Sequence, residues 1–438
     1  MVKHTRLTAI AGLGIAALLS LTACSGAGSA SGGGSADGKV TLQMVESLTN
    51  PDRTKLIRSL LDDFQKENPD ITVKLVSPPT EQADTTIQQM LQSGKGIDVL
   101  EVRDLTVGPF ANNKWLYDMT GDLKNWDGWS ALTDNARNAA KTDGKTWFVP
   151  YGFYGLSLFY RTDLVSQAGF DTPPHSWDDL LEQASKIQDP GNNVYGYAFR
   201  GGKNANSNVV AAINSYTIDD LDPTNAFLLK SGKTVFSSPD AQKAVDTYFD
   251  LFKKASPPSA VSWGYPEMVA GFTNGTTGFL LQDPEVIATV SASNLGKDQW
   301  STAPLLVGPS GKAAQPFATA GWGIAQGSKN KAAAVKLVEF LSSEKPATTF
   351  AQKNSLVPIV TSATKDPFFA TGPWASYVTM TKDPDTYVTV HQPRGVAWWS
   401  EWSQKADQDV QSVLLGNMST KQLLASWDEY WTAKYKKG

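Results

Sequence analysis

The chain contains very little cysteine and histidine. Among its 438 residues there are one cysteine, Cys24, and three histidines. A lone cysteine cannot form an internal disulfide, and so few histidines leave little material for a histidine-based metal site or a Ser-His-Asp hydrolase. The acidic turn Asp219–Asp222 lacks the ligand spacing and the glycine of a calcium-binding loop. The composition therefore predicts no metal site, no cofactor and no enzyme of these classes.

The chain also lacks a basic tract and a second long apolar run. It carries 39 basic and 43 acidic residues, for a net charge of −4, and loss of Lys3 and Arg6 with a leader would make this −6. A mildly acidic chain of this kind is not typical of nucleic-acid binding. The one long apolar run, Leu7–Leu21, is too short to span a bilayer comfortably.

The N-terminus has the pattern of an export signal. A basic start, an apolar run and small residues before Cys24 are typical of a secretory signal peptide. Leu21-Thr22-Ala23-Cys24 resembles the bacterial lipobox, in which the cysteine is lipidated and becomes the first mature residue. We expect a signal peptide at 1–23, a lipid on Cys24 and a flexible Gly/Ser/Ala tether at 24–38. The protein would then be held at the extracellular face of the bacterial cytoplasmic membrane. A plain signal peptide with an incidental cysteine is the alternative.

The chain that follows alternates between strand-like and helix-like patterns. Leu56–Phe64 places apolar residues on one helical face, and Thr85–Gln92 suggests a second helix. Further along, Ser176 is expected to cap a helix that begins at Trp177, with Asp179 in the capping-box position. The alternation predicts an α/β domain with a largely parallel sheet. Its strands are expected at Val40–Val45, Ile71–Leu75 and Asp98–Val102.

Short sequence blocks occur in a fixed order over about residues 40–435. They are Phe64–Ile71, Gly96–Leu100, Asp143–Pro150, Leu158–Leu164, Ala168-Gly169, Pro173-Pro174, Ser176–Leu180, Met268–Gly275, Gly321–Ile324, Ser328–Lys331 and Phe340–Ser343. Together, behind the lipobox, these blocks resemble the sugar-type extracellular solute-binding proteins of ABC importers, the group that includes the maltose-binding proteins.

The resemblance implies an α/β fold of two lobes with a ligand cleft between them. Three chain crossings would join the lobes, near Val149–Gly155, Thr302–Val307 and Gln352–Pro358. The first lobe, lobe 1, would comprise 39–149 and 306–351, and the second, lobe 2, would comprise 150–305 and 352–438. The protein would be a monomer that captures a sugar, more an oligosaccharide than a monosaccharide, and delivers it to ABC permease subunits driven by a cytoplasmic ATPase.

A sugar site needs aromatic plates and polar side chains that bond to hydroxyls in a cleft. Several polar residues follow expected strands or lie in loops, and two tyrosines belong to the first crossing. The polar candidates are Glu46, Arg103, Asp104, Tyr151, Tyr154, Arg200, Asn204, Gln282, Asp283 and Arg394. The aromatic candidates are Trp263, Trp322 and one of the adjacent pair Trp398 and Trp399, which we do not expect to face one core together. We expect the remaining tryptophans considered, Trp115, Trp147, Trp177, Trp427 and Trp431, to fill cores.

Two other functions stay open at the level of the sequence. The ligand of such a binding protein could be a solute other than a sugar, such as an amino-acid derivative, a polyamine or a metal chelate. A secreted glycoside hydrolase needs only two carboxylates, which the chain can supply. Binding of oligosaccharides without their cleavage would separate a receptor from a hydrolase.

Overall fold

The computed structural model describes residues 39–49, 51–142, 144–394, 396 and 398–436. The expected signal peptide, the lipidation site Cys24 and the tether therefore lie outside the described residues. In the part of the chain that is described, no helix is long and apolar enough to cross a membrane.

The larger of two main sheets carries the expected first strands. Its strand order is β12-β11-β3-β1-β2, and β6 also pairs with β11. β1 runs parallel to both β2 and β3, so this part of the sheet is parallel as predicted. The strands are β1 (Val40–Val45), β2 (Ile71–Val76), β3 (Val99–Arg103), β6 (Phe148–Tyr154), β11 (Ala313–Ile324) and β12 (Tyr387–His391).

Helices α1 (Pro51–Glu67) and α2 (Thr80–Ser93) connect the first three strands. The predicted apolar face of α1 is buried, because its residues recur at helical spacing and pack in the core. α1 ends just before Asn68-Pro69. α2 ends at Gly94, whose left-handed backbone conformation suits a residue without a Cβ. Both helices are confirmed, although α2 begins at Thr80 rather than at Thr85.

The smaller sheet has the strand order β10-β7-β9-β8. β7 pairs antiparallel with β10 and β9, and in the larger sheet β11 is antiparallel to β3 and β6. β12 runs parallel to β11 and β8 parallel to β9, so both sheets are mixed, and the expected largely parallel arrangement is confirmed for β1–β3. The strands are β7 (Ser157–Arg161), β8 (Tyr195–Tyr197), β9 (Thr277–Gln282) and β10 (Trp300–Ala303); β4 (Lys141–Thr142) and β5 (Lys145–Thr146) form a separate pair.

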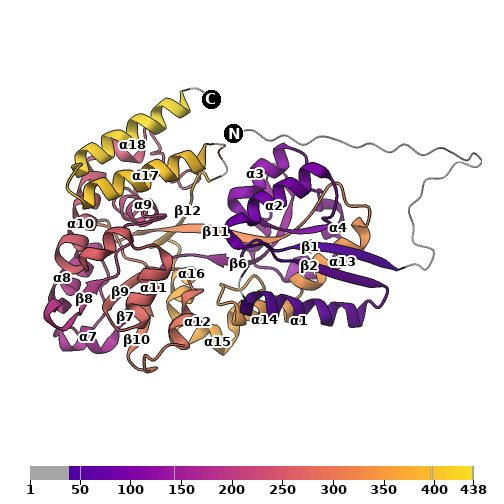
Figure 1. Ribbon diagram of the computed structural model, residues 1–438, viewed down its shortest axis with the longest axis horizontal. Helices are drawn as coiled ribbons and strands as arrows, with labels where there is room; N and C mark the ends of the chain where they lie inside the picture. The colour runs from indigo at the N-terminus through magenta and orange to yellow at the C-terminus, as the bar shows by residue number, and fades with distance from the viewer. Residues whose placement is uncertain (1–38, 50, 143, 395, 397, 437–438) are drawn as a thin grey trace, which may run out of the picture. The chain divides into compact units, whose positions relative to one another are not determined.

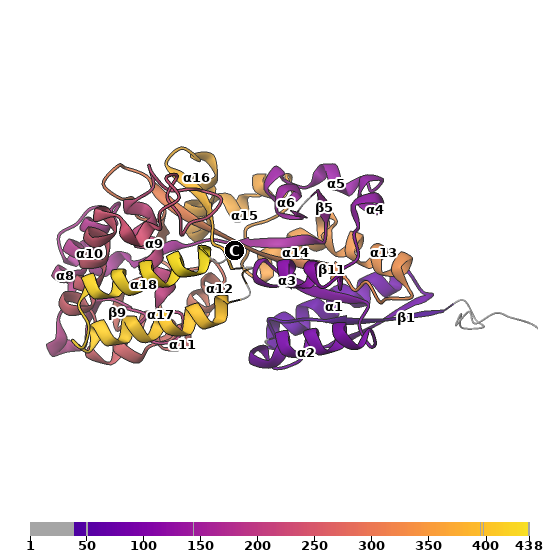
Figure 2. The ribbon, with the colours of Figure 1, turned by 90° about the horizontal axis from the view of Figure 1, so that it is seen from above.

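Each main sheet is covered by its own helices, which gives two lobes joined by β6 and β11 (Figures 1 and 2). Lobe 1 also contains α3 (Asp104–Asn112), α4 (Thr120–Lys124), α5 (Gly128–Ala131), α6 (Asp134–Ala139), α13 (Lys331–Ser342) and α14 (Glu344–Lys353). Lobe 2 contains α7 (Thr162–Gln167), α8 (Trp177–Ile187), α9 (Asn206–Tyr216), α10 (Pro239–Ala255), α11 (Tyr265–Thr273), α12 (Val286–Ser291), α15 (Pro367–Ala370), α16 (Ala375–Lys382), α17 (Trp399–Leu414) and α18 (Thr420–Tyr435). Ser176 caps α8 and forms the predicted capping box with Asp179.

The passages between the lobes agree with expectation at one place and differ at two. β6 lies in the larger sheet and β7, which follows it directly, in the smaller one, which matches the passage near Val149–Gly155. The expected passage at Thr302–Val307 is wrong, because Thr302 pairs with β7 and Val307 bridges to Ser176 within lobe 2. β11 itself makes this crossing. The third passage lies later than expected, since the amide of Thr361 still donates to Ala131 of lobe 1.

Candidate functional site

Two groups of charged side chains lie where the larger sheet faces lobe 2. Because β1 and β3 are parallel, their carboxyl ends meet at one edge of the sheet, which is where open α/β sheets bind ligands. Glu46 follows β1, and Asp104 follows β3. One group is buried inside lobe 1, and the other links the two lobes.

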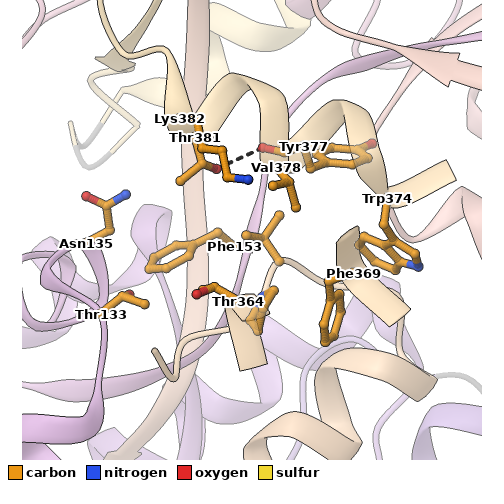
Figure 3. Close-up of a pocket in the computed structure, with 12 residues that line it drawn as sticks. Thr133, Asn135, Phe153, Thr364, Phe369, Trp374, Tyr377, Val378, Thr381 and Lys382 are labelled. Atoms are coloured by element: carbon orange, nitrogen blue, oxygen red, sulfur yellow. Dashed lines mark hydrogen bonds between the residues drawn. The ribbon is translucent and has the colours of Figure 1, made fainter. Parts of the chain in front are cut away.

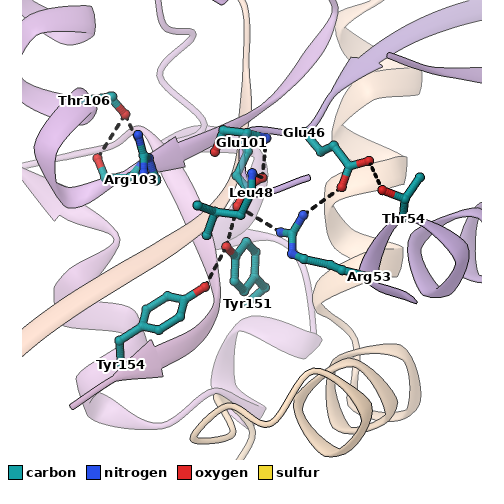
Figure 4. Close-up of polar contacts among 10 residues, drawn as sticks. Glu46, Leu48, Arg53, Thr54, Glu101, Arg103, Thr106, Tyr151 and Tyr154 are labelled. Atoms are coloured by element: carbon teal, nitrogen blue, oxygen red, sulfur yellow. Dashed lines mark hydrogen bonds and ion pairs between the residues drawn. The ribbon is translucent and has the colours of Figure 1, made fainter. Parts of the chain in front are cut away.

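The buried group, which we call the lobe 1 network, centres on Arg53 of α1 (Figure 4). Its guanidinium contacts Glu46 and Glu101, each with an N–O distance of 2.9 Å, and all three side chains are at most 2% exposed. Thr54 donates a hydrogen bond to Glu46, and the backbone amide of Ser47 donates one to Glu101. The network holds the loop after β1 to β3 and α1.

This pairing fixes the ionisation of the network. Burial opposes the charge of Arg53, but Glu101, the nearby tyrosines and Glu46 raise its pKa above the ordinary value. Burial likewise opposes the charge of Glu101, and Arg53, the Ser47 amide and the Tyr151 hydroxyl outweigh it, so that the pKa of this carboxyl is lowered. Arg53 and Glu101 therefore carry opposite charges in the folded protein. Glu46 is fully buried in the network, and its expected role as a ligand contact is corrected to a structural one.

Two tyrosines of β6 lead from the network toward lobe 2. Tyr151 donates a hydrogen bond to Glu101, and its hydroxyl oxygen lies 3.2 Å from that of Tyr154. Tyr151 is 1% exposed and belongs to the core, whereas Tyr154 is partly exposed. Burial and the charge of Glu285 raise the pKa of Tyr154. Of the two expected contacts from the first crossing, only Tyr154 presents a surface to a ligand.

The second group, which we call the interlobe cluster, comprises Asp104, Arg200, Asp283, Glu285 and Arg394. All five side chains are partly exposed. Arg394, in the loop after β12, forms an ion pair with Asp104 at the start of α3, with an N–O distance of 3.6 Å. The side chains of this pair are 27% and 25% exposed. The pair therefore lies at a surface that water and a ligand can reach.

The carboxyl groups of the interlobe cluster are poorly compensated. Burial and the charge of Glu285 raise the pKa of Asp283 to about 7, although Arg394 and Arg200 act against this shift. Burial raises the pKa of Glu285, although the nearby Tyr265 acts against this shift. Burial also raises the pKa of Asp104. Carboxyl groups with perturbed pKa values that lie near one another are candidates for a functional site.

One cluster member, Arg200, precedes a lobe 2 loop that Asp407 of α17 holds in place. The Asp407 carboxylate accepts hydrogen bonds from the backbone amides of Asn204 and Asn206, at 2.7 and 3.1 Å. Arg200 donates to the carbonyl of Lys203 at 2.9 Å. Burial lowers the pKa of Arg200 below its ordinary value, although the nearby charges of Asp283 and Asp407 act against this shift. Asn204 thus uses its backbone to fix the loop, and its exposed side chain stays a predicted contact.

Other candidates are buried or held by neighbouring residues. Gln282 is 3% exposed, and its side-chain carbonyl accepts the amide of Asp283. Arg103 forms an ion pair with Asp84 of α2. Gln282 therefore shapes the loop that carries Asp283, and it is corrected to a supporting residue.

The expectation that Trp322 stands on the cleft wall is wrong. The side chain is 2% exposed, and its ring centroid lies 5.0 Å from that of Tyr151 and 6.0 Å from that of Phe350. The preceding Gly321 serves close strand packing, since a Cβ there would lie 2.1 Å from the carbonyl oxygen of Val149. Trp322 is a core residue of β11, packed against Tyr151 of β6 and Phe350 of α14.

The tryptophans of lobe 2 divide differently from expectation. Trp398 and Trp399 both pack against Trp431, with centroid distances of 4.4 and 6.4 Å, so adjacent positions do share one aromatic core. Both keep part of their surface exposed and remain candidates. Trp263 is also partly exposed and lies beside Gly271 of α11. Trp177, Trp427 and Trp431 are buried as predicted.

Glu285 and Tyr265 also belong to this site, although neither was expected from the sequence. Glu285 lies just beyond Asp283, on the far side of Pro284, and Tyr265 begins α11. The position of Glu285 shortly after β9 could have indicated it as a site residue, as it did for Asp283. Tyr265 had no such signal, because its approach to Glu285 depends on how α11 packs beside β9. Among the described residues, no group of three or more His, Cys, Asp or Glu lies together as a metal site.

The sequence profile of the bacterial extracellular solute-binding proteins matches residues 50–348, more than half of the chain. The chain belongs to this family. Members of the family are binding proteins rather than enzymes. A binding protein of Brucella abortus is 23% identical over 366 residues, covering 81% of this chain and 83% of that protein. The mannitol-binding protein of Pseudomonas aeruginosa is 26% identical over 268 residues, 58% of each.

Solved structures give the same fold. The maltose-bound MalE3 of T. maritima has a TM-score of 0.76 and 23% sequence identity, over 89% of this chain and 98% of that one. The two-lobed α/β architecture expected from the sequence is thereby confirmed, and the profile match confirms the relation to the extracellular solute-binding proteins. The residue boundaries assigned to the lobes stay a prediction.

Proposed function

We propose that this solute-binding protein takes up a neutral sugar or polyol between its lobes, at the interlobe cluster. The observation that carries the proposal is the ion pair of Asp104 with Arg394, beside Asp283, Glu285 and Arg200. Carboxylates accept hydrogen bonds from hydroxyls, and guanidinium groups donate to them in a fixed geometry. The names of relatives that bind mannitol and maltose support a polyhydroxylated ligand.

Closure of the lobes would trap the ligand. Asp104 belongs to lobe 1, and Asp283 with Glu285 belongs to lobe 2, so a ligand touching all three favours the state in which they are close. Such a ligand shifts the population toward the closed form by binding it better. Tyr154, Tyr265 and the exposed parts of Trp263, Trp398 and Trp399 would supply faces for the C–H surfaces of the ligand.

The surroundings of the protein are part of the same proposal. We infer a lipid on Cys24, a tether at residues 24–38, and a monomer at the outer face of the cytoplasmic membrane. The closed form would dock on ABC permease subunits, which a cytoplasmic ATPase drives. Metabolic labelling with an alkyne fatty acid tests the lipid, and Cys24→Ser should abolish the label. Label retained on Cys24→Ser would contradict it.

A thermal-shift screen of monosaccharides, oligosaccharides and polyols tests the ligand class. A ligand that binds only the native state raises the melting temperature, and calorimetry on each hit gives its dissociation constant. Polyamines, amino acids and metal chelates in the same screen cover the alternative solutes. If only members of those classes raised the melting temperature, the sugar or polyol proposal would fail.

The glycoside hydrolase alternative uses the same carboxyl groups, because a raised pKa such as that of Asp283 is what a general acid requires. Incubation of the protein with each oligosaccharide hit, followed by product analysis, decides between the two functions. We expect binding without turnover. Cleavage that is lost in Asp283→Asn would instead establish the hydrolase.

A further inference from the structure

A cavity of about 200 Å³ lies where the two lobes meet beside β6 (Figure 3). Thr133, Asn135 and Val357 border it from lobe 1, Phe153 from β6, and α16 from lobe 2. We call this space the hinge cavity. None of the interlobe cluster residues lines it.

The inner walls of the hinge cavity are aromatic and buried. Phe153, Phe369, Trp374 and Tyr377 line it and are 1–7% exposed. Figure 3 shows Phe369 and Trp374 on one side of the space and Thr133 and Asn135 on the other. Aromatic walls favour an aromatic ring, which can meet them edge to face or offset. A cavity of about 150 Å³ holds benzene in another protein. The hinge cavity, at about 200 Å³, therefore accommodates one ring with a small substituent.

The rim of the hinge cavity is polar and positively charged. Lys382, at the end of α16, and Asn135 are exposed, and neither side chain forms a hydrogen bond or ion pair within the described part of the chain. An ammonium beside an apolar pocket suits a carboxylate attached to the ring, since it can donate to the carboxylate oxygens.

A sugar suits this cavity poorly. The lining hydroxyls of Thr364 and Thr381 already donate to main-chain carbonyls, at 2.7 and 2.8 Å. The buried walls would leave most hydroxyls of a polyol without partners, which costs free energy. The ligand of the hinge cavity therefore differs in chemistry from the ligand of the cleft.

We propose that the hinge cavity is a second binding site, for a single-ring aromatic carboxylate whose ring lies among Phe153, Phe369 and Trp374 and whose carboxylate lies at Lys382. Benzoate is the probe, and benzamide is its uncharged counterpart of nearly equal shape. Calorimetric titration of the whole chain with benzoate should give saturable binding with a dissociation constant below about 1 mM.

Two substitutions and a matched control locate the site. Val378→Trp places an indole in the cavity and should abolish benzoate binding. Lys382→Gln should weaken benzoate about tenfold and leave benzamide unchanged. Lys365→Gln changes another exposed lysine of lobe 2 that does not line the cavity, and should change neither. Because Lys382 is exposed, its variant will fold even if Val378→Trp does not.

The test separates this site from the cleft. Asp283→Asn should leave benzoate binding intact, because Asp283 does not line the hinge cavity. The proposal is overturned by absence of saturable binding, by benzoate binding that survives in folded Val378→Trp, or by equal losses in the two lysine variants. Loss in Asp283→Asn would also overturn it, since benzoate would then occupy the cleft.

Discussion

The lobe 1 network and the interlobe cluster are built from the same residue types and behave in opposite ways. In the network, one arginine lies between two carboxylates at 2.9 Å, and the side chains are at most 2% exposed. In the cluster, the one ion pair has a distance of 3.6 Å and about a quarter of each side chain is exposed. The pKa of Glu101 is lowered, so its charged form is favoured, whereas the pKa of Asp283 is raised, so its charged form is disfavoured.

The difference shows which carboxylates are available to a ligand. A buried carboxylate that is fully paired has no hydrogen-bonding capacity left for a hydroxyl, and separating it from its partner is costly. A partly exposed carboxylate held near another one gains from a ligand that donates hydrogen bonds to it. Geometry therefore assigns structure to the network and binding to the cluster.

Loss of Arg53 should produce the largest effect. Arg53→Ala leaves Glu46 and Glu101 buried without their cation, and we expect a loss of about 3–5 kcal/mol in the free energy of unfolding. Urea denaturation measures it. Arg58→Ala, at an exposed position on the same helix, is the control. It should change the free energy of unfolding by at most about 0.5 kcal/mol. Equal losses in the two variants would show that the network contributes nothing specific.

Loss of one carboxylate of the interlobe cluster should weaken ligand binding and leave the stability of the fold unimpaired. Asp283→Asn keeps the side-chain shape and removes a charge that burial and Glu285 disfavour, so the free energy of unfolding should stay level or rise. The affinity for the identified sugar or polyol should fall about tenfold or more, which is about 1.4 kcal/mol. Calorimetry at pH 8 measures the affinity. A destabilised variant with unchanged affinity would make Asp283 structural.

Local patterns allowed the sequence to predict part of this architecture. The apolar face of α1 and the Ser176 cap of α8 depend on residues within one or two turns, and both are confirmed. The family blocks indicated two lobes and directed attention to Asp104 and Asp283. Their partnership with Arg394 joins residues far apart in sequence, so only the folded chain shows it.

The errors have a common physical origin in long-range packing. Trp322 between two glycines gave no sign that Tyr151, far earlier in the chain, and Phe350 would pack against it. Glu46 looked like a loop carboxylate, because nothing local shows that Arg53 turns inward from the first turns of α1. The aromatic core around Trp431 likewise includes both Trp398 and Trp399.

The pH dependence of binding should sharpen the contrast. With the pKa of Asp283 at about 7, the carboxylate that accepts hydroxyls is protonated as the pH falls, and affinity should drop about tenfold between pH 8 and pH 6. Glu285, whose pKa is also raised, acts in the same direction. Calorimetry across this range measures it. In Asp283→Asn the dependence should flatten, and an unchanged slope would exclude Asp283 as its source.

The stability of the unliganded protein should depend on pH in the opposite sense to the ligand affinity. The native carboxyl of Asp283 retains its proton up to about pH 7, whereas the unfolded one loses it near 3.8, so the native state binds more protons between these values. The free energy of unfolding should therefore decrease as the pH rises from about 4 to 7. Urea denaturation of the wild type and of Asp283→Asn at each pH measures this decrease. Subtracting the two free energies of unfolding cancels the contribution of all other titrating groups.

The interlobe ion pair should give the smallest effect on stability. Arg394→Ala removes a partly exposed partner of Asp104. Such pairs contribute about 0.2–1 kcal/mol. Lys312→Ala, which breaks an exposed ion pair with Asp219 outside the cluster, is the matched control and should cost a similar amount. The two variants should differ in ligand affinity, which falls at least threefold only in Arg394→Ala. Equal affinities would mean that the pair between the lobes is a surface contact, and the ligand contacts would then rest on Asp283, Glu285 and Arg200.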